Sequence, residues 1–286
     1  MKYDVIIIGG GLGGLTAGAK LAKEGKKVLL LEQHDRPGGC ATTFTRKDYT
    51  MEVGLHEMDG LHPADGKTRI FNDLGLFDGV EYLPVPEFYR FYNGRTDLVM
   101  SHDREAAIGM LNSEFPGEKK GILTYFERLA NARRINVSER DVPDISIGEY
   151  LDSIFTNEEI KLVLLGNLGY FHDDPYTLSL RYFSMAENAY FNGRANFIKG
   201  GSQQLSDKLV SVIRSFGGKV LLNHKVSKIE TENGALTNVE FQNTMPGDHP
   251  RVKATADQYV VNAALPLVTG MIDDPAGRQL EQEMSE

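Results

Sequence analysis

Residues 5–14 read Val-Ile-Ile-Ile-Gly-Gly-Gly-Leu-Gly-Gly, and this stretch decides the fold. Its first four residues are apolar and β-branched, which predicts a strand buried on both faces of a parallel sheet. The glycines predict a tight turn into a helix from Leu15 to about Glu24, which Gly25 ends. A second apolar strand, 28–31, follows. This order of strand, turn, helix and strand is typical of an α/β fold.

The spacing of the glycines fits a dinucleotide site. Gly9 permits the tight turn, Gly11 lets the backbone approach a pyrophosphate, and Gly14 brings the helix against the strand. The helix N-terminus favours the negative charge of the phosphates. Glu32 ends the second strand, close to the roughly 20-residue separation expected for a carboxylate that accepts hydrogen bonds from a ribose and repels a 2′-phosphate. The residues expected around the phosphates are Gly9, Gly11, Leu12, Gly13 and Gly14.

A second glycine segment follows Glu32 and reads Arg36-Pro37-Gly38-Gly39-Cys40. Here the sequence resembles the FAD-dependent superfamily of amine oxidases, phytoene desaturases, carotenoid isomerases and retinol saturases, and residues 29–44 look most like the desaturase and saturase branch. The resemblance implies that Arg36, Gly38 and Gly39 lie along the pyrophosphate and ribityl chain of FAD. Paired glycines expose backbone N–H groups and arginine is a good phosphate partner, which agrees with this assignment.

Other segments carry the same resemblance. A strand pair, 44–46 and 49–53, would lead to a glycine beside the flavin, and a Lys-Gly-Gly segment precedes a helix over 203–216 that Ser202 would cap. Cys40 is expected to be a small buried side chain, and His56 either faces the flavin or has a structural role. The resemblance adds these residues to the cofactor site: Gln33, Cys40, Gly54, His56, Lys225 and Val226.

The resemblance implies a discontinuous, Rossmann-like FAD/NAD(P)-binding domain over 1–66 and 197–286, with an inserted α+β substrate domain over 67–196. In the binding domain we expect strands at 219–222, 226–230, 236–241 and 258–261, with an Asn233-Gly234 turn between the second and third. Family members continue with a glycine-rich C-terminal segment. Here a loop at 273–277 and a polar tail end the chain at Glu286. The C-terminal portion of the domain is therefore expected to be missing, and FAD binding by the chain alone is expected to be weak or transient.

The insertion is rich in aromatic residues. A hairpin over 88–92 and 97–100 is predicted, as are helices over 103–115 (with Asp103 as cap), 119–134, 157–165 and 177–188. The rings either line an apolar tunnel for a polyene substrate or form the core, and for any single ring the core is favoured. They are Phe88, Tyr89, Phe91, Tyr92, Tyr125, Phe126, Tyr170, Phe171, Tyr182, Phe183, Tyr190 and Phe191.

Composition excludes several classes of function. The net charge of −9 argues against a nucleic-acid surface, and no apolar run reaches the roughly 18 residues that span a bilayer. Cys40 is the single cysteine, so a reducing, cytoplasmic setting is expected. The chain starts directly with a strand, so no leader is expected. The histidines lack metal-ligand spacing, so no metal site is expected. His172 and the two aspartates after it are read as a turn.

The sequence therefore predicts an FAD-dependent oxidoreductase that desaturates, saturates or isomerises carbon–carbon double bonds of a lipophilic, carotenoid- or retinoid-like substrate. No catalytic side chain is identified, because in desaturase-type flavoenzymes the flavin itself accepts hydride. Two alternatives stay open: an FAD-dependent amine oxidase, and a non-catalytic, truncated or lipid-carrier protein such as the Rab escort proteins. A carotenoid substrate would imply peripheral membrane contact, which no basic amphipathic helix supports independently. The sequence gives no oligomeric state.

Overall fold

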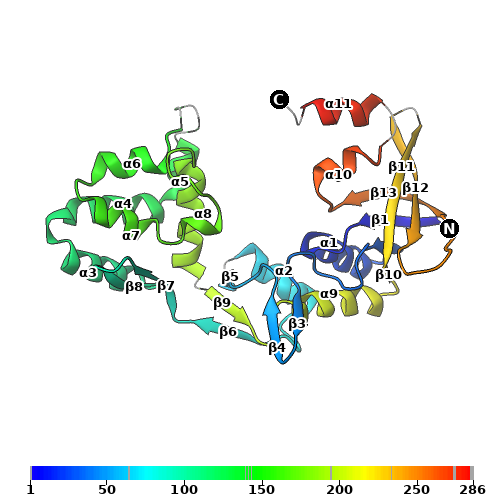
Figure 1. Cartoon of the computed structure of the whole chain (residues 1–286), viewed down its shortest axis with the longest axis horizontal. Helices are drawn as coiled ribbons and strands as arrows, with labels where there is room; N and C mark the ends of the chain where they lie inside the picture. Colours follow the sequence, from blue (N-terminus) through cyan, green and yellow to red (C-terminus); the bar gives the residue numbers. More distant parts are fainter. Residues whose placement is uncertain are drawn as a thin grey trace. The chain divides into compact units, whose positions relative to one another are not determined.

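The computed structural model describes residues 2–63, 65–138, 140, 142, 144–193, 195–232, 234–272 and 275–283. The chain divides into two compact units, coloured by sequence in Figure 1. The first comprises residues Met1–His56, Ile70–Tyr82 and Ile198–Glu286, and the second comprises Glu57–Arg69 and Leu83–Phe197. Each unit is considered by itself.

The first unit is built on a six-stranded sheet with the order β10-β2-β1-β13-β12-β11. The strands β10, β2, β1 and β13 run parallel, and β13, β12 and β11 form an antiparallel meander. The central strand β1 therefore has β2 on one side and β13 on the other. In such sheets a crevice opens beyond the carboxyl ends of the strands where the order reverses. The elements of this unit are β1 (Lys2–Ile8), α1 (Leu12–Lys23), β2 (Val28–Leu31), β3 (Thr43–Arg46), β4 (Tyr49–Glu52), α9 (Gln203–Ser215), β10 (Lys219–Leu221), β11 (His224–Glu232), β12 (Ala235–Asn243), β13 (Val252–Val261), α10 (Leu265–Thr269) and α11 (Pro275–Glu283).

Both faces of the parallel strands are covered. Alternate side chains of a strand point to opposite faces, and Ile7 faces α1, where its side chain lies against Gly14 and Gly18. Helix α9 packs beside α1 (Figure 1), and a Cβ on Gly18 would come within 3.0 Å of Ile213 of α9. Ile6 and its neighbours on the other face pack with buried residues of β11 and β12. Burial on both sides explains the uninterrupted apolar sequence of β1 and β2.

The second unit is mainly helical. Its longer segment begins in β6 (Tyr82–Val85) and ends in β9 (Ala195–Ile198), and the sheet order there is β5-β9-β6. Among the described residues, a hydrophobic core of this unit draws on the two strands β7 and β8 and on the five helices α3, α4, α6, α7 and α8. The remaining elements are β5 (Met58–Asp59), α2 (Gly66–Leu74, which crosses the unit boundary), β7 (Glu87–Tyr92), β8 (Asp97–Ser101), α3 (Arg104–Glu114), α4 (Lys119–Ala130), α5 (Ala132–Ser138), α6 (Ile147–Ile154), α7 (Glu158–Leu164), α8 (Leu180–Gly193) and 3₁₀ turns at Pro116–Glu118 and Leu168–Tyr170.

The compact units differ from the division expected from the sequence. Residues 57–66 belong to the second unit because β5 pairs with β9. Residues 70–82 belong to the first, where Asp73 bonds Lys20 and Lys23 of α1. The roles expected for the two parts, cofactor binding and substrate binding, stay predictions.

Several local predictions need correction. The expected helix over 119–134 breaks at Asn131 into α4 and α5. Ser202 precedes α9 but makes no capping hydrogen bond through its side chain, and its hydroxyl donates to Glu52 at 2.6 Å. Pro275 starts helix α11 where a loop was expected, while residues 273 and 274 lie outside the described part. Helix α6 was not predicted, although Ser146 and Glu149 form a capping box at its start.

The hairpins and the Asp103 cap are as expected. Strand β3 pairs with β4 and β7 with β8. The Asp103 side chain accepts from Ala106 N at 2.9 Å. The pairing of β11 with β12 extends to Glu232 and Ala235. Gly234, between these two residues, has φ +77°. Asn233 of the expected turn lies outside the described residues.

One buried acid stands in the core of the second unit. Glu187 of α8 is 1% exposed, and its carboxylate accepts from Asn167 Nδ2 at 2.7 Å. Burial raises the pKa of Glu187 to about 8. The rings of Tyr125 and Tyr89 are the other ionisable groups that interact with it, and burial holds the pKa of both phenols well above 10. The core therefore holds Glu187 as a neutral acid near pH 7.

This gives a signed prediction for stability. Between the ordinary pKa of 4.5 and about 8, the folded state keeps a proton on Glu187 that the unfolded state has lost. Folding stability therefore falls as pH rises through this window, by on the order of 1 kcal/mol per pH unit. Glu187→Gln removes the effect, so its melting temperature should exceed that of the wild type by a margin that grows from about pH 5 to about pH 8. Melting curves of both proteins, with the exposed Glu105→Gln as control, check this; a margin independent of pH would contradict it.

Candidate dinucleotide-binding site

The turn between β1 and α1 admits only glycine at two positions. Gly9 has φ +100°, and a Cβ there would overlap the carbonyl oxygen of Asn262. A Cβ on Gly14 would overlap the carbonyl oxygen of Gly9 and come within 3.3 Å of the Ile7 side chain. The first constraint sets the turn and the second sets the distance between helix and strand, as the glycine spacing predicts.

The second glycine segment lies directly against this turn. Gly38 N donates to Gly10 O at 2.7 Å, and Gly11 and Gly38 form a parallel bridge. Gly38 has φ +119°, and a Cβ there would lie 2.6 Å from Ser206 Oγ of α9, whose hydroxyl donates to Ala41 O at 2.8 Å. The two glycine segments, far apart in sequence, thus form one wall of backbone with no side chains between them.

Glu32 ties the same turn to the end of β2. It is 6% exposed, and its two carboxylate oxygens accept from Gly10 N at 2.6 Å and from His34 N at 2.9 Å. Each carboxylate oxygen can accept a further hydrogen bond. Glu32 therefore has a structural role in holding the turn, in addition to the ribose contact that the sequence predicts.

A cavity of about 340 Å³ opens at the two glycine segments. None of its lining residues is charged, and the volume is at the lower end of the roughly 300–1,000 Å³ usual for small-molecule sites. We call it the glycine cleft. It is lined by Gly11, Leu12, Gly13, Gly38, Cys40, Ala41, Gly54, Leu55 and Asn262.

Six of the residues predicted from the sequence line the cleft: Gly11, Leu12, Gly13, Gly38, Cys40 and Gly54. Gly39 lies beside it, since its Cβ would be 3.3 Å from Gly11 Cα, and Gly9, Gly14 and Glu32 support it from the turn and from β2. Cys40 is exposed, so the expectation that it is a buried filler is wrong.

The other five predicted residues are not part of the lining. Arg36 is exposed and donates to Thr43 O at 2.9 Å and to Asp35 at 3.2 Å. The guanidinium of Arg36 lowers the pKa of Asp35. Gln33 and His56 are exposed.

Lys225 and Val226 belong to β11, and the Val226 side chain is buried. The start of β11 lies beside the end of β2, since His224 N donates to Glu32 O at 2.8 Å. The contacts of all five residues with a cofactor stay predictions.

Asn262 was missed by the sequence-based assignment. It directly follows β13, and its backbone N donates to Ile8 O at 2.8 Å, so it stands at the carboxyl ends of the central strands. Its position after a predicted strand running toward the cofactor was the available signal.

The residues present fit a dinucleotide. The N-cap of α1 is Gly11, which offers no side chain to the first-turn N–H groups, and the first turn contains no acidic residue. These N–H groups lack intrahelical acceptors and carry the positive end of the helix dipole. Gly11 has φ −69°, which any residue can adopt, so what glycine provides here is space for a ligand rather than backbone freedom. The cleft thus offers donors and small side chains to a phosphate-bearing ligand.

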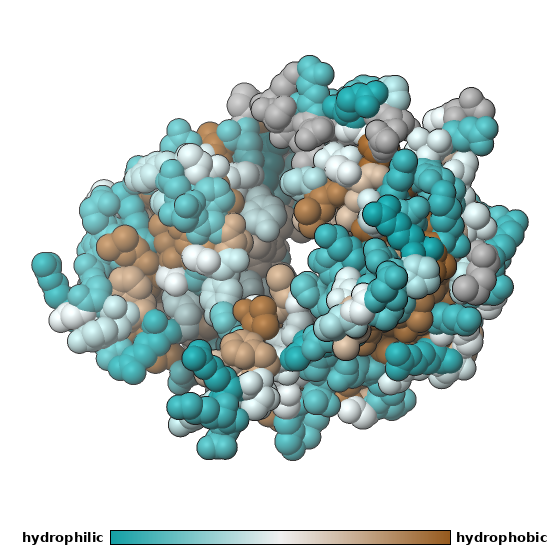
Figure 2. Space-filling model, turned by 45° about the vertical axis from the view of Figure 1, so that its right-hand side comes forward, coloured by the Kyte–Doolittle hydropathy of each residue, from teal (hydrophilic) through white to brown (hydrophobic). Residues whose placement is uncertain are grey.

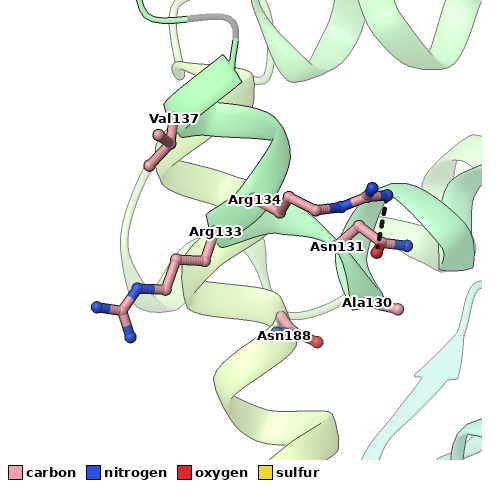
Figure 3. Close-up of a pocket in the computed structure, with 6 residues that line it drawn as sticks. All are labelled: Ala130, Asn131, Arg133, Arg134, Val137 and Asn188. Carbon is pink, nitrogen blue, oxygen red and sulfur yellow. Dashed lines mark hydrogen bonds between the residues drawn. The ribbon is translucent and has the colours of Figure 1, made fainter.

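A second cavity, of about 440 Å³, lies on the helical unit between α5 and α8. Figure 3 shows Arg133 and Arg134 of α5 extending in different directions, with Arg134 bonded to Asn131 at 3.2 Å. Their guanidinium groups do not converge on a common point, so this cavity is not assigned as a site.

On the face shown in Figure 2, hydrophobic side chains lie in separate groups among hydrophilic ones.

Fold and cleft together define a dinucleotide-binding protein of the Rossmann type. A profile described as flavin containing amine oxidoreductase matches residues 12–284, and the chain belongs to this family. Its cofactor is accordingly FAD, as the sequence predicts.

The chain is similar to several characterised proteins. It is 28% identical over 267 residues to all-trans-retinol 13,14-reductase of Danio rerio, covering 79% of this chain and 42% of the relative. It is 26% identical over 270 residues to the chloroplastic prolycopene isomerase of Daucus carota, covering 85% and 44%. The chain thus spans less than half the length of these relatives.

Solved structures share the fold. An oxidoreductase from Methanosarcina mazei superposes with a TM-score of 0.71 at 20% identity, covering 99% of this chain and 64% of that one. A putrescine oxidase bound to putrescine gives 0.63 at 18% identity, covering 99% and 63%. A Rab GDI from Plasmodium falciparum gives 0.57 at 14% identity, covering 91% and 65%.

Among the residues that the structure describes, no group of His, Cys, Asp and Glu could hold a metal ion. None of the described helices has both the length and the apolar character of a membrane span.

The tight approach of α1 to β1 can be tested by adding one methyl group. Gly14→Ala places a Cβ against the Gly9 carbonyl and should destabilise the first unit by about 1–3 kcal/mol, lowering its melting temperature by several degrees. Gly270→Ala is the matched control in the same unit, because the nearest atom that a Cβ there would meet is Leu267 O at 3.7 Å. Equal melting temperatures for the two variants would contradict the packing described.

Proposed function

We propose that this chain forms the dinucleotide-binding part, with an attached second unit, of an FAD-dependent oxidoreductase acting on carbon–carbon double bonds of a lipophilic polyene. The observation that carries the proposal is the pairing of the two glycine segments at the cleft, through Gly38 N to Gly10 O. An NAD-only site needs the first segment alone. The second segment extends the row of backbone donors along the path that a longer dinucleotide would take.

The roles of the site residues follow from their chemistry. The first-turn N–H groups of α1, at Leu12 and Gly13, bind the pyrophosphate. Glu32 holds the turn and accepts from a ribose hydroxyl, and Arg36 exchanges its contact with Asp35 for a phosphate. Gly38 and Gly39 border the ribityl chain, and Gly54 lies nearer the ring. When bound, the flavin supplies the hydride-transfer chemistry, and the protein positions the reactants and excludes water.

A polyene substrate is favoured by two sequence relatives, a retinol reductase and a prolycopene isomerase, because both are named after polyenes. The aromatic residues of the second unit do not add to this support. Neither cavity is lined by an aromatic ring. Nine of the twelve rings singled out in the sequence belong to the core or pack against it: Phe88, Tyr89, Phe91, Tyr125, Phe126, Phe171, Phe183, Tyr190 and Phe191.

Amine oxidation is the second candidate, because the family description names amines. The putrescine oxidase and Rab GDI likenesses, at 18% and 14% identity, support the fold and not a substrate or a carrier role. We further propose a cytoplasmic location with peripheral membrane contact; the exposed thiol of Cys40 fits a reducing compartment.

FAD binding tests the site. Titration of the purified chain, followed by flavin fluorescence, should give saturable binding that Gly11→Val abolishes and Glu32→Ala weakens by about 10–100-fold, the loss expected for a hydrogen bond to a charged group. Circular dichroism establishes that each variant is folded. Folded Gly11→Val that binds FAD as tightly as the wild type would overturn the site assignment.

Substrate class is tested with FAD-loaded protein under anaerobic conditions. In its oxidised form and after reduction with dithionite, the protein is mixed with a retinoid, a carotenoid or a diamine. The proposal predicts that a polyene changes the visible flavin spectrum in one of the two forms. A response to the diamine alone would favour amine oxidation, and a response to none would favour a binding protein.

A further inference from the structure

One residue of the glycine cleft, Asn262, makes no side-chain hydrogen bond within the described part of the chain. Asn262 is exposed at the carboxyl end of β13 and lines the cleft. A Cβ on Gly11 would lie 2.9 Å from its Nδ2, and a Cβ on Gly13 would lie 2.7 Å from its Oδ1. The carboxamide therefore lies beside Gly11 and Gly13, at the start of α1.

The backbone of Asn262 is held independently of its side chain. Its N–H donates to Ile8 O at 2.8 Å, and its carbonyl lies against Gly9. The packing that fixes the end of β13 thus uses main-chain atoms. A change of the side chain is expected to leave the strand and the turn in place.

The environment of the cleft favours Nδ2, the donor atom of the carboxamide, as the group that meets a ligand. No residue lining the cleft is charged, although the chain as a whole carries a net charge of −9. The positive end of the α1 dipole lies at the same place. An anion seated there would find backbone donors on the α1 side, and Nδ2 of Asn262 is the side-chain donor of the lining on the β13 side.

We propose that Asn262 is a cofactor-binding and selectivity residue: its Nδ2 donates to the anionic pyrophosphate from the side opposite α1. The inference rests on the proposed function, because it needs FAD in the cleft. It also gives a second reason for glycine at positions 11 and 13, since a side chain at either position would displace the carboxamide of Asn262.

Isosteric substitution provides the first test. Asn262→Asp replaces the donor by a carboxylate facing the phosphates, so FAD affinity should fall at least about tenfold near pH 7 and recover as the pH is lowered toward the pKa of the new acid. Asn262→Ala should lose about tenfold at every pH. The melting temperatures of both variants without FAD should match the wild type. Gln258→Glu makes the same exchange of amide for acid on β13 outside the cleft, and should bind FAD as the wild type does.

A double-mutant cycle provides the second test. Gly13→Ala alone should weaken FAD binding, because its methyl group displaces the Asn262 carboxamide. In an Asn262→Ala background the same change should have little further effect, since no carboxamide remains to be displaced.

The outcomes separate this inference from the proposed function. If the wild type binds FAD, Gly11→Val does not, and Asn262→Asp binds like the wild type, the role of Asn262 is wrong and the site stands. If the folded wild type binds no FAD, the proposed function fails and takes the inference with it. Additive effects of Gly13→Ala and Asn262→Ala would overturn the coupling between these residues.

Discussion

The rest of the first unit depends on the contact between two backbone segments that carry no side chains. Gly38 N donates to Gly10 O, Gly11 bridges to Gly38, and a Cβ on Gly39 would lie 3.3 Å from Gly11 Cα. Gly9 and Gly14 set the turn and the helix so that the first segment is presented at the carboxyl end of β1. Glu32 then holds Gly10 N and so fixes the turn from β2. A wall of peptide groups results, and a phosphate can approach it closely.

Much of this could be predicted from the sequence because the constraints are local. The strand–glycine–helix pattern, the acid after the second strand and the glycine pair each have a short-range physical cause, and the structure places them together. Asn262 was missed because its role depends on β13 lying beside β1, a pairing between the two ends of the chain. The prediction that Ser202 caps α9 was wrong because it considered the neighbouring sequence alone. The Ser202 hydroxyl donates to Glu52, which is distant in sequence.

For any single aromatic ring of the helical unit, the sequence favours the core over a substrate tunnel. Rings such as Phe183 and Tyr125 are buried in the core, where large apolar side chains contribute most to stability. Glu187 is a buried polar group of this unit that composition and periodicity could not place.

The central claim is that the glycine cleft recognises an adenine dinucleotide, and equilibrium dialysis of the folded chain against FAD and against FMN tests it most directly. FMN carries the flavin ring and ribityl phosphate but lacks the pyrophosphate and adenosine, which are the parts assigned to the α1 N-terminus and Glu32. The account predicts that FAD is retained and that FMN is not. Equal retention of FMN and FAD, or no retention of FAD by folded protein, would contradict it.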